Sequence, residues 1–141
     1  MNRPMSKPSP DLLRNVRLFS DLDEKDLESL ADEFNERRFS AGDRIALEGE
    51  GGLMFFVVDS GEAAVEVHGD EVGKLGPGDA FGEVALIDGG ERSATVVAET
   101  RVHCFGLAPW VFRPLVEENP ELGWKMLEGL AKLLREAQER A

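Results

Sequence analysis

Between Asn35 and Leu107 the sequence is divided into short apolar or alternating runs, which glycine-containing turns separate. Glycine supplies positive φ angles and proline presets a turn, so a segment such as Gly76-Pro77-Gly78-Asp79 ends one strand and leads into the next. Short strands with this spacing predict an antiparallel sandwich, jelly roll or barrel. The runs expected to form strands are Ile45 to Leu47, Leu53 to Val58, Ala63 to Val67, Val72 to Leu75, Thr95 to Ala98 and Val102 to Leu107.

Two helices are expected before this β segment, over Asp11 to Val16 and over Ser20 to Phe34. The Asp23 side chain is able to cap the first N–H groups of the second helix. Apolar residues of that helix are spaced i, i+3, i+4, i+7 and share one face, which we expect to pack against the rest of the domain. These residues are Leu27, Leu30, Ala31 and Phe34.

Two further helices are expected after the β segment. Pro109 to Glu118 has proline in its first turn, and Asn119-Pro120-Glu121 supplies the N-cap, N1 proline and acidic first turn of a longer helix that runs to the end of the chain. Either one apolar stripe of the long helix packs on the β segment and the other on a partner helix, or both pack within the chain. The stripes are Met126, Leu130, Leu133 and Ala137, and Leu127, Ala131 and Leu134.

Length and composition limit the classes of function. A chain of 141 residues with one cysteine, Cys104, is expected to form one domain without an internal disulfide. No apolar run approaches the ~20 residues that a membrane-spanning helix needs, so no membrane contact is expected. Residues 1–10 contain three prolines and no apolar signal core, and are predicted to be a disordered leader. Together these features predict a cytoplasmic protein.

The charge and the histidines exclude further classes. The 28 acidic and 16 basic residues give a net charge of −12, which repels phosphate backbones, so direct nucleic-acid binding is not expected. A jelly-roll metalloenzyme would need clustered histidines, but His68 and His103 fall in different expected strands. Neither Cys104 nor any serine has an obvious base partner, so we predict no enzyme, no metal site and no cofactor.

The stretch from Glu83 onward has the chemistry of a ligand site. Glu83-Val84-Ala85-Leu86 is long enough for one helical turn, whose unpaired N–H groups favour an anion. Arg92, across the Gly89-Gly90 turn, is placed to bring its guanidinium onto that anion, and Ser93 adds a hydroxyl. A carboxylate beside a phosphate is repulsive, so Glu83 is expected to accept from a hydroxyl such as a ribose 2′-OH. Phosphate and ribose together indicate a nucleotide; a surface Arg-Glu pair without a ligand is the alternative.

Two segments resemble the phosphate-binding cassette of cyclic nucleotide-binding domains, namely Phe81-Gly82-Glu83-Val84-Ala85-Leu86 and Glu91-Arg92-Ser93-Ala94-Thr95-Val96. Upstream, Phe39 to Asp43, Glu48-Gly49-Glu50 and Leu75 to Asp79 also follow the family's glycine and apolar pattern. The bacterial catabolite activator proteins and the regulatory subunits of protein kinase A belong to this family.

The resemblance implies a mainly β domain over residues 11–141, with the cyclic nucleotide inside it. Its centre would be an eight-stranded antiparallel β-roll (jelly roll) at about residues 35–107. N-terminal helices and a long C-terminal helix would flank the roll, with the C-terminal helices at about residues 109–140. In the activators the long helix closes over the base and forms the dimer seam. The resemblance therefore implies a regulatory sensor whose ligand repositions this helix, with a homodimer through it.

The same resemblance implies roles for individual residues. Glu83 would accept from the ribose 2′-OH, Arg92 would neutralise the cyclic phosphate, and Ser93 would bond it. Gln138 is able to bond the base, with a solvated helix-surface glutamine as the alternative. The predicted ligand is cAMP, with cGMP as the alternative. The full set of predicted ligand-binding residues is Gly82, Glu83, Val84, Ala85, Arg92, Ser93, Ala94, Val65, Val72, Gly73, Phe81 and Gln138.

Another hypothesis keeps the fold and drops the ligand. A degenerate domain of the same fold would serve as a ligand-free docking or dimerisation module. Such domains usually lose the cassette arginine or glutamate, whereas Glu83 and Arg92 are both present in this chain. The sequence therefore favours the nucleotide sensor.

Overall fold

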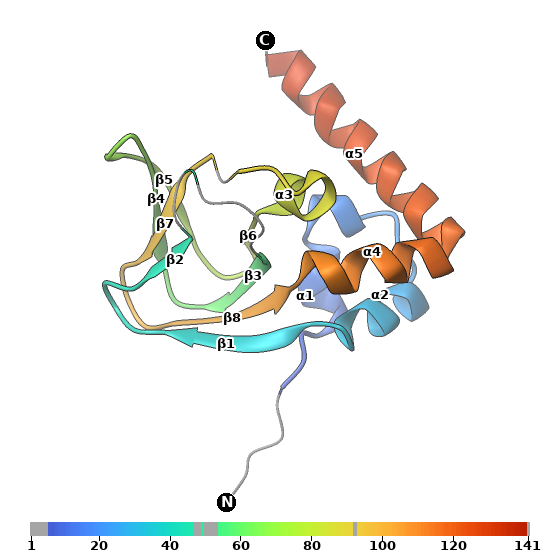
Figure 1. Cartoon of the computed structure of the whole chain (residues 1–141), viewed down its shortest axis with the longest axis horizontal. Helices are drawn as coiled ribbons and strands as arrows, with labels where there is room; N and C mark the ends of the chain where they lie inside the picture. Colours follow the sequence, from blue (N-terminus) through green and yellow to red (C-terminus); the bar gives the residue numbers. More distant parts are fainter. Residues whose placement is uncertain (1–5, 47–48, 50–53, 92, 141) are drawn as a thin grey trace, which may run out of the picture.

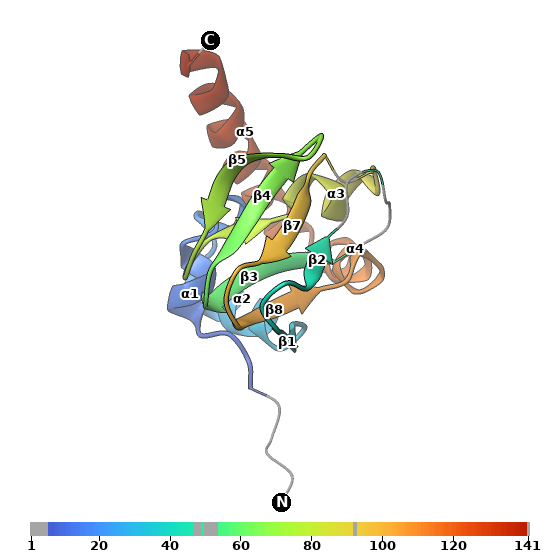
Figure 2. The same ribbon diagram turned by 90° about the vertical axis from the view of Figure 1, so that its left-hand side faces the viewer.

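The computed structural model describes residues 6–46, 49, 54–91 and 93–140. In this part of the chain, eight antiparallel strands form two four-stranded sheets with the orders β1-β8-β3-β6 and β2-β7-β4-β5 (Figures 1 and 2). The predicted eight-stranded antiparallel roll is therefore confirmed. The strands are β1 (Asn35–Phe39), β2 (Arg44–Ala46), β3 (Phe55–Ser60), β4 (Ala63–Val67), β5 (Asp70–Leu75), β6 (Ala80–Phe81), β7 (Thr95–Ala98) and β8 (Val102–Leu107).

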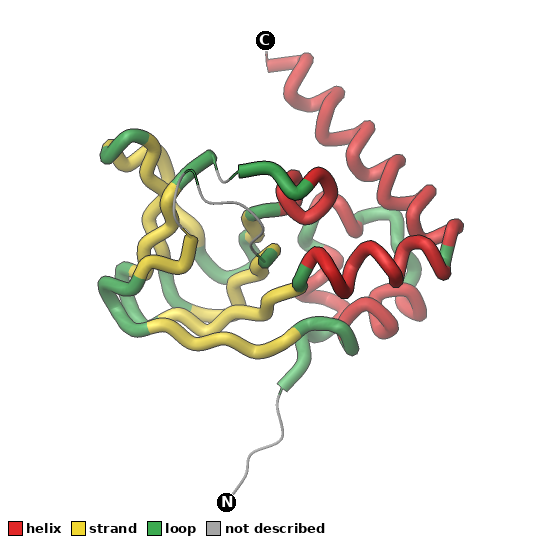
Figure 3. Tube along the Cα trace, in the orientation of Figure 1, coloured by secondary structure: helices red, strands yellow, loops and turns green. Residues whose placement is uncertain are grey.

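The helices gather at one side of the roll, and the last of them projects beyond it (Figure 3). The expected flanking helices, including the long C-terminal one, are present. No helix in the described residues is long and apolar enough to cross a membrane. The helices are α1 (Pro10–Arg14), the 3₁₀ helix η1 (Arg17–Phe19), α2 (Glu24–Ala31), α3 (Glu83–Asp88), α4 (Pro109–Glu118) and α5 (Pro120–Arg140).

The second N-terminal helix is shorter than the sequence predicts. The segment expected as one helix over Ser20 to Phe34 begins as a turn, and α2 starts only after Asp23, whose backbone is extended. The Asp23 carboxylate accepts from the Asp26 N–H at 2.8 Å, which closes a capping box and fixes the start of the helix. The expected apolar face is buried, although Phe34 lies beyond the end of α2.

The described part of the predicted leader belongs to the folded domain. Ser9 caps α1 by accepting from the Leu12 N–H at 3.1 Å, and Pro10 is the first residue of that helix. Lys7 forms an ion pair with Asp32 at 2.9 Å. Pro10 fits this position because proline is well suited to the first turn of a helix, whereas the proline content of residues 1–10 alone indicates disorder. Residues 1–5 lie outside the described part of the chain.

Strand β3 separates two apolar clusters. Its alternate residues Phe55 and Val57 belong to a cluster that the helices cover, whereas Phe56 and Val58 belong to a second cluster inside the roll. All four side chains are buried. In the first cluster, the Phe55 ring packs edge-on against the Phe19 ring with centroids 5.7 Å apart. A single strand therefore joins the helical layer to the roll.

Two strands, β1 and β6, were not among the runs that the sequence predicts as strands. The sequence of β1, Asn-Glu-Arg-Arg-Phe, is mostly polar, and β6 has only two residues. Backbone pairing with β8 places β1 in the sheet, in a register that runs from Asn35 opposite Gly106 to Phe39 opposite Val102. Because backbone hydrogen bonds are independent of side-chain polarity, this strand leaves no apolar period in the sequence.

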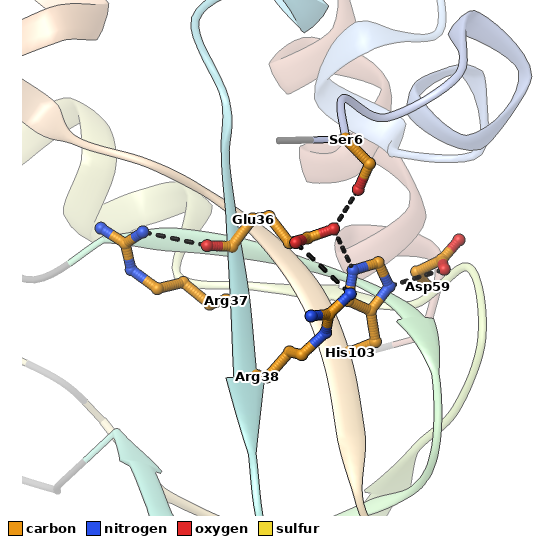
Figure 4. Close-up of polar contacts among 6 residues, drawn as sticks. All are labelled: Ser6, Glu36, Arg37, Arg38, Asp59 and His103. Atoms are coloured by element: carbon orange, nitrogen blue, oxygen red, sulfur yellow. Dashed lines mark hydrogen bonds and ion pairs between the residues drawn. The ribbon is translucent and has the colours of Figure 1, made fainter. Parts of the chain in front are cut away.

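A group of polar residues joins β1, β3 and β8 on the outer side of their sheet (Figure 4). The His103 Nε2 atom lies 2.8 Å from Glu36 Oε2, and its Nδ1 atom lies 2.8 Å from Asp59 Oδ2. Carboxylates only accept hydrogen bonds, so a ring nitrogen that carries a hydrogen donates to the carboxylate beside it. Arg38 forms an ion pair with Glu36 at 3.4 Å, and the Ser6 hydroxyl donates to the same carboxylate. His103 on β8 thus links β1 and β3 through its side-chain contacts with Glu36 and Asp59.

The turn between β3 and β4 depends on glycine. Gly61 has φ +94°, and a Cβ atom there would lie 2.2 Å from the Arg101 carbonyl oxygen. Gly42 has φ +93° but would meet nothing within 4 Å. We expect Gly42→Ala to lower the free energy of unfolding by about 1–2 kcal/mol through backbone strain alone. Gly61→Ala should cost about 1–3 kcal/mol more, because the backbone overlap adds to the strain.

Urea denaturation of the two alanine variants and the wild type measures this difference. The two substitutions match in residue type and in φ, so the difference between them isolates the close approach of Gly61 to the backbone of Arg101. Equal losses of stability in the two variants would contradict the assigned packing of this turn.

The Glu36 carboxylate should make the fold sensitive to acid. The hydrogen bond from Ser6 and then the bond from His103 hold the pKa of Glu36 below its usual 4.5. A carboxyl pKa that is lower in the folded state stabilises the fold above about pH 4.5, and this contribution is lost as pH falls through the folded-state pKa. We therefore expect Glu36→Gln to flatten the decline of unfolding free energy as pH falls below about 4.5. Exposed Glu139, replaced by glutamine, is the control, and parallel pH profiles for all three proteins would refute the assignment.

Candidate functional site

A cavity of about 470 Å³ opens where α3 meets the sheet β2-β7-β4-β5. This volume lies within the range of small-molecule sites, roughly 300–1,000 Å³. The wall combines apolar strand residues with polar residues from α3 and from the segment that follows it. The lining residues are Ala46, Val65, Leu75, Ala80, Phe81, Gly82, Glu83, Ala85, Asp88, Gly90, Glu91, Ser93, Ala94 and Val96.

Two glycines set the ends of α3 beside this cavity. Gly82 precedes the helix with φ 92°, in the left-handed region that glycine adopts without strain, and Gly89 ends it with φ 68°. The expected turn over Glu83 to Leu86 is therefore present and continues to Asp88. Leu86 is buried in the helix-covered cluster, so the cassette helix is anchored on the side away from the cavity.

The strands give the cavity an apolar wall. Val65 on β4 pairs with Val96 on β7, and directly paired residues face the same side of a sheet. Phe81 extends the wall, and its ring lies 5.3 Å from the Phe56 ring, in contact with the cluster inside the roll. Leu75, at the end of β5, is part of the same wall. A flat apolar group such as a purine would contact this part of the cavity.

The polar wall is acidic where the structure describes it. Glu83, Asp88 and Glu91 line the cavity together with the Ser93 side chain, and no described lining residue is basic. The Asp88 carboxylate also accepts from the Gly90 N–H at 2.7 Å, which shapes the segment after α3. An anionic ligand would therefore need a cation from outside this set. Arg92, the cation that the sequence predicts, lies outside the described residues.

The structure brings many of the predicted site residues together around the cavity. Those that line it are Val65, Phe81, Gly82, Glu83, Ala85, Ser93 and Ala94. Val84 contributes backbone to α3, while its side chain is not described.

Three predicted contacts are not made at this cavity. Val72 is 62% exposed and is not among the lining residues. Gly73 pairs with Val65 but is not among the lining residues. Gln138 is exposed in the last turns of α5, and no α5 residue lines the cavity. Helix α5 packs along η1 and α4, and its end projects beyond the rest of the described domain (Figures 1 and 2).

Some lining residues were not predicted from the sequence. Ala46, Leu75, Ala80 and Val96 come from four strands, and the sheet pairing that gathers them is long-range. Strand alternation would have indicated Leu75 and Val96 once the neighbouring inward residues were known. Glu91 begins the second cassette segment, and Asp88 lies between the two segments. The structure places both residues at the cavity wall, which the sequence alone did not predict. Among the described residues, no group of three or more His, Cys, Asp or Glu is placed to hold a metal ion.

Comparison with known proteins adds independent evidence. The family model for the cyclic nucleotide-binding domain matches residues 36–119. The cAMP-dependent protein kinase regulatory subunit of Yarrowia lipolytica is 32% identical over 82% of this chain. The chain spans only 31% of the length of that relative.

Solved structures agree in fold. The N-terminal domain of a transcriptional regulator from Streptomyces coelicolor is similar with a TM-score of 0.84 and 28% identity, over 92% of this chain and 96% of that one. The catabolite activator protein of Thermus thermophilus is similar with a TM-score of 0.73 and 31% identity, over 89% of this chain and 61% of that one. Since the family model covers more than half of the sequence and includes both cassette segments, the chain belongs to the cyclic nucleotide-binding domain family.

Proposed function

We propose that this chain is a cyclic nucleotide sensor that binds cAMP in the cavity beside α3 and repositions α5 in response. The observation that carries the proposal is that cassette residues, with Glu83 and Ser93 among them, line one cavity of ligand size. Membership of the cyclic nucleotide-binding domain family supports the class of ligand. The proposed activity is binding, without catalysis.

Each wall of the cavity has a proposed partner on the nucleotide. Glu83 accepts from the ribose 2′-OH, and Ser93 bonds the cyclic phosphate, whose charge Arg92 neutralises. The purine lies against the apolar wall that includes Val65 and Phe81. The acidic wall explains why the arginine matters: without it, the described lining carries only negative charge and would repel the phosphate.

The choice of cAMP rests on similarity. The Yarrowia lipolytica relative is named as a cAMP-dependent regulatory subunit, and that property is proposed for this chain by analogy. Val65 and Phe81 provide apolar contact to either purine, so cGMP is the alternative ligand. A titration with both nucleotides ranks them.

Catalysis by the single cysteine is disfavoured by its environment. Cys104 is fully buried inside the roll. Burial raises the pKa of its thiol to about 12, so the thiol stays protonated near neutral pH. Because the thiolate is the nucleophilic form, this residue is a packing group in the proposed sensor.

A homodimer through α5 is the second part of the proposal. One predicted stripe of α5 packs within the chain: Met126 is buried and Leu130 packs against the helix-covered cluster. The other stripe is open, with Leu127 54% exposed and Leu134 64% exposed. Trp124, one turn before Leu127, is 65% exposed and extends the apolar surface. Such a stripe on one helix is suited to pairing with the same stripe of a second copy.

Isothermal titration with cAMP and then cGMP tests the proposed ligand. We expect micromolar binding of cAMP, about −8 kcal/mol. Arg92→Ala should weaken it about 10- to 150-fold, because a charge-assisted hydrogen bond contributes about 1.5–3 kcal/mol. Arg113→Ala is the matched control, since Arg113 is exposed on α4 and pairs with Glu117 at 2.8 Å.

The two hypotheses give different outcomes in this titration. Wild-type affinity in Arg113→Ala and its loss in Arg92→Ala support the sensor. If a folded protein free of co-purified ligand bound neither nucleotide, the sensor would be refuted and a ligand-free docking module favoured.

Light scattering coupled to size exclusion tests the dimer. We expect twice the mass of the chain for the wild type and a single mass for the double variant Leu127→Glu/Leu134→Glu, because a carboxylate is costly to bury in an apolar interface. Arg140→Glu introduces a carboxylate on the opposite face of the same helix, at a residue that is 78% exposed, and should remain dimeric. A wild type that stays monomeric at high micromolar concentration would contradict this part of the proposal.

A further inference from the structure

Helix α5 packs along η1 and α4, and ion pairs join it to the N-terminal segment. Charge pairs follow the helix: Lys125 Nζ lies 2.7 Å from Asp26 Oδ2, Lys132 pairs with Asp21, and Glu136 pairs with Arg17. The pairs are spaced seven and four residues apart on α5, so they share one face of the helix. All their partners lie within residues 17–26, in η1, in α2 or between them.

A glycine lies in the middle of this ladder of charge pairs. Gly129 is buried, and a Cβ atom there would lie 2.8 Å from the Leu18 carbonyl oxygen and 3.0 Å from the Arg17 carbonyl oxygen. Those neighbours are backbone atoms, which cannot turn aside as the end of a flexible side chain can. The missing side chain therefore lets α5 lie directly on η1, between the pairs of Lys125 and Lys132.

These contacts are made with α5 outside the cavity. No residue of α5 lines the cavity, and the end of α5 projects beyond the rest of the described domain (Figure 1). Movement of its last turns toward the cavity would separate Lys132 from Asp21 and Glu136 from Arg17, unless η1 moved with the helix. It would also separate Gly129 from the backbone of Leu18.

We propose that the Gly129 contact and the three charge pairs form an autoinhibitory latch that keeps α5 in a resting position and lowers the affinity of the cavity for its nucleotide. This inference rests on the proposed sensor function and adds the contact that regulates it. When only a fraction of the molecules is in the binding-competent state, the apparent affinity is lower than the intrinsic affinity by that fraction. Weakening the latch therefore raises nucleotide affinity.

Charge reversal tests the ionic part of the latch. Asp21→Lys and Lys132→Asp each place like charges together, and we expect each to tighten cAMP binding about two- to fivefold, the factor that matches an exposed ion pair. The double variant Asp21→Lys/Lys132→Asp restores an opposite pair and should return the affinity to that of the wild type. Single variants that bind cAMP as the wild type does, or more weakly, would overturn the proposal.

The glycine contact has a matched control on the same helix. Gly129→Ala forces the helix off the Leu18 carbonyl and should also tighten cAMP binding. Gly123→Ala brings the same gain in helix propensity, but its Cβ atom would meet only a methyl group of the Val116 side chain, at 2.8 Å. We expect Gly123→Ala to bind as the wild type does. If the two substitutions changed the cAMP affinity equally, the change would be due to helix propensity and the latch would be refuted.

A distance measurement without ligand separates failure of the latch from failure of the sensor. Spin labels at Val72→Cys and Gln138→Cys, both at exposed positions, report the position of α5 relative to β5. The latch predicts one dominant distance in the wild type and a broader or shifted distribution when Gly129→Ala or Lys132→Asp is added. This result would support the latch even if cAMP did not bind. Identical distributions in all the proteins would overturn the latch whether or not the nucleotide binds.

Discussion

The helical layer, the roll and the candidate site all depend on one strand that is buried on both faces. Phe55 and Val57 of β3 face the helix-covered cluster, while Phe56 and Val58 face the cluster inside the roll. The same strand pairs with β6, which leads through Gly82 into α3. Because both faces of β3 must fit a packed core, a shift of the strand would disturb the helices and the cavity together. The place of the cassette helix thus follows from core packing.

Burial explains which strands could be predicted from the sequence. A strand whose side chains face a core carries an apolar run or period, and the prediction from Leu53 to Val58 contains β3. β1 lacks that signal because its charged residues are held by backbone pairing and by His103. The bond between His103 and Glu36 joins residues 67 positions apart, a distance at which sequence pattern gives no information. Local pattern therefore predicted the roll but not every strand in it.

The residues of the candidate site also fall into two groups, those that local sequence predicts and those that depend on long-range packing. Glu83, Ala85 and Ser93 were predicted because the cassette is nearly continuous in the chain, so local sequence was sufficient. Val72 does not line the cavity, and its facing could not be predicted from alternation because the pairing of β4 with β5 is irregular between Val65 and Glu66. Gln138 depends on the direction of a whole helix, which packing against η1 decides. Long-range geometry determined the outcome in both cases.

The strength of the contacts along α5 suits the proposed sensor, in which nucleotide binding moves this helix. In their ion pairs Lys132 and Arg17 are each 56% exposed, while their partners Asp21 and Glu136 are 19% and 29% exposed. Partly exposed pairs of this kind contribute about 1 kcal/mol or less. The close packing of Gly129 on the backbone of Leu18 fixes where α5 lies without a further charged contact. Several weak ion pairs around one close backbone contact therefore hold α5 in one position. The free-energy difference between this resting position and others remains small, as the proposed reversible sensor requires.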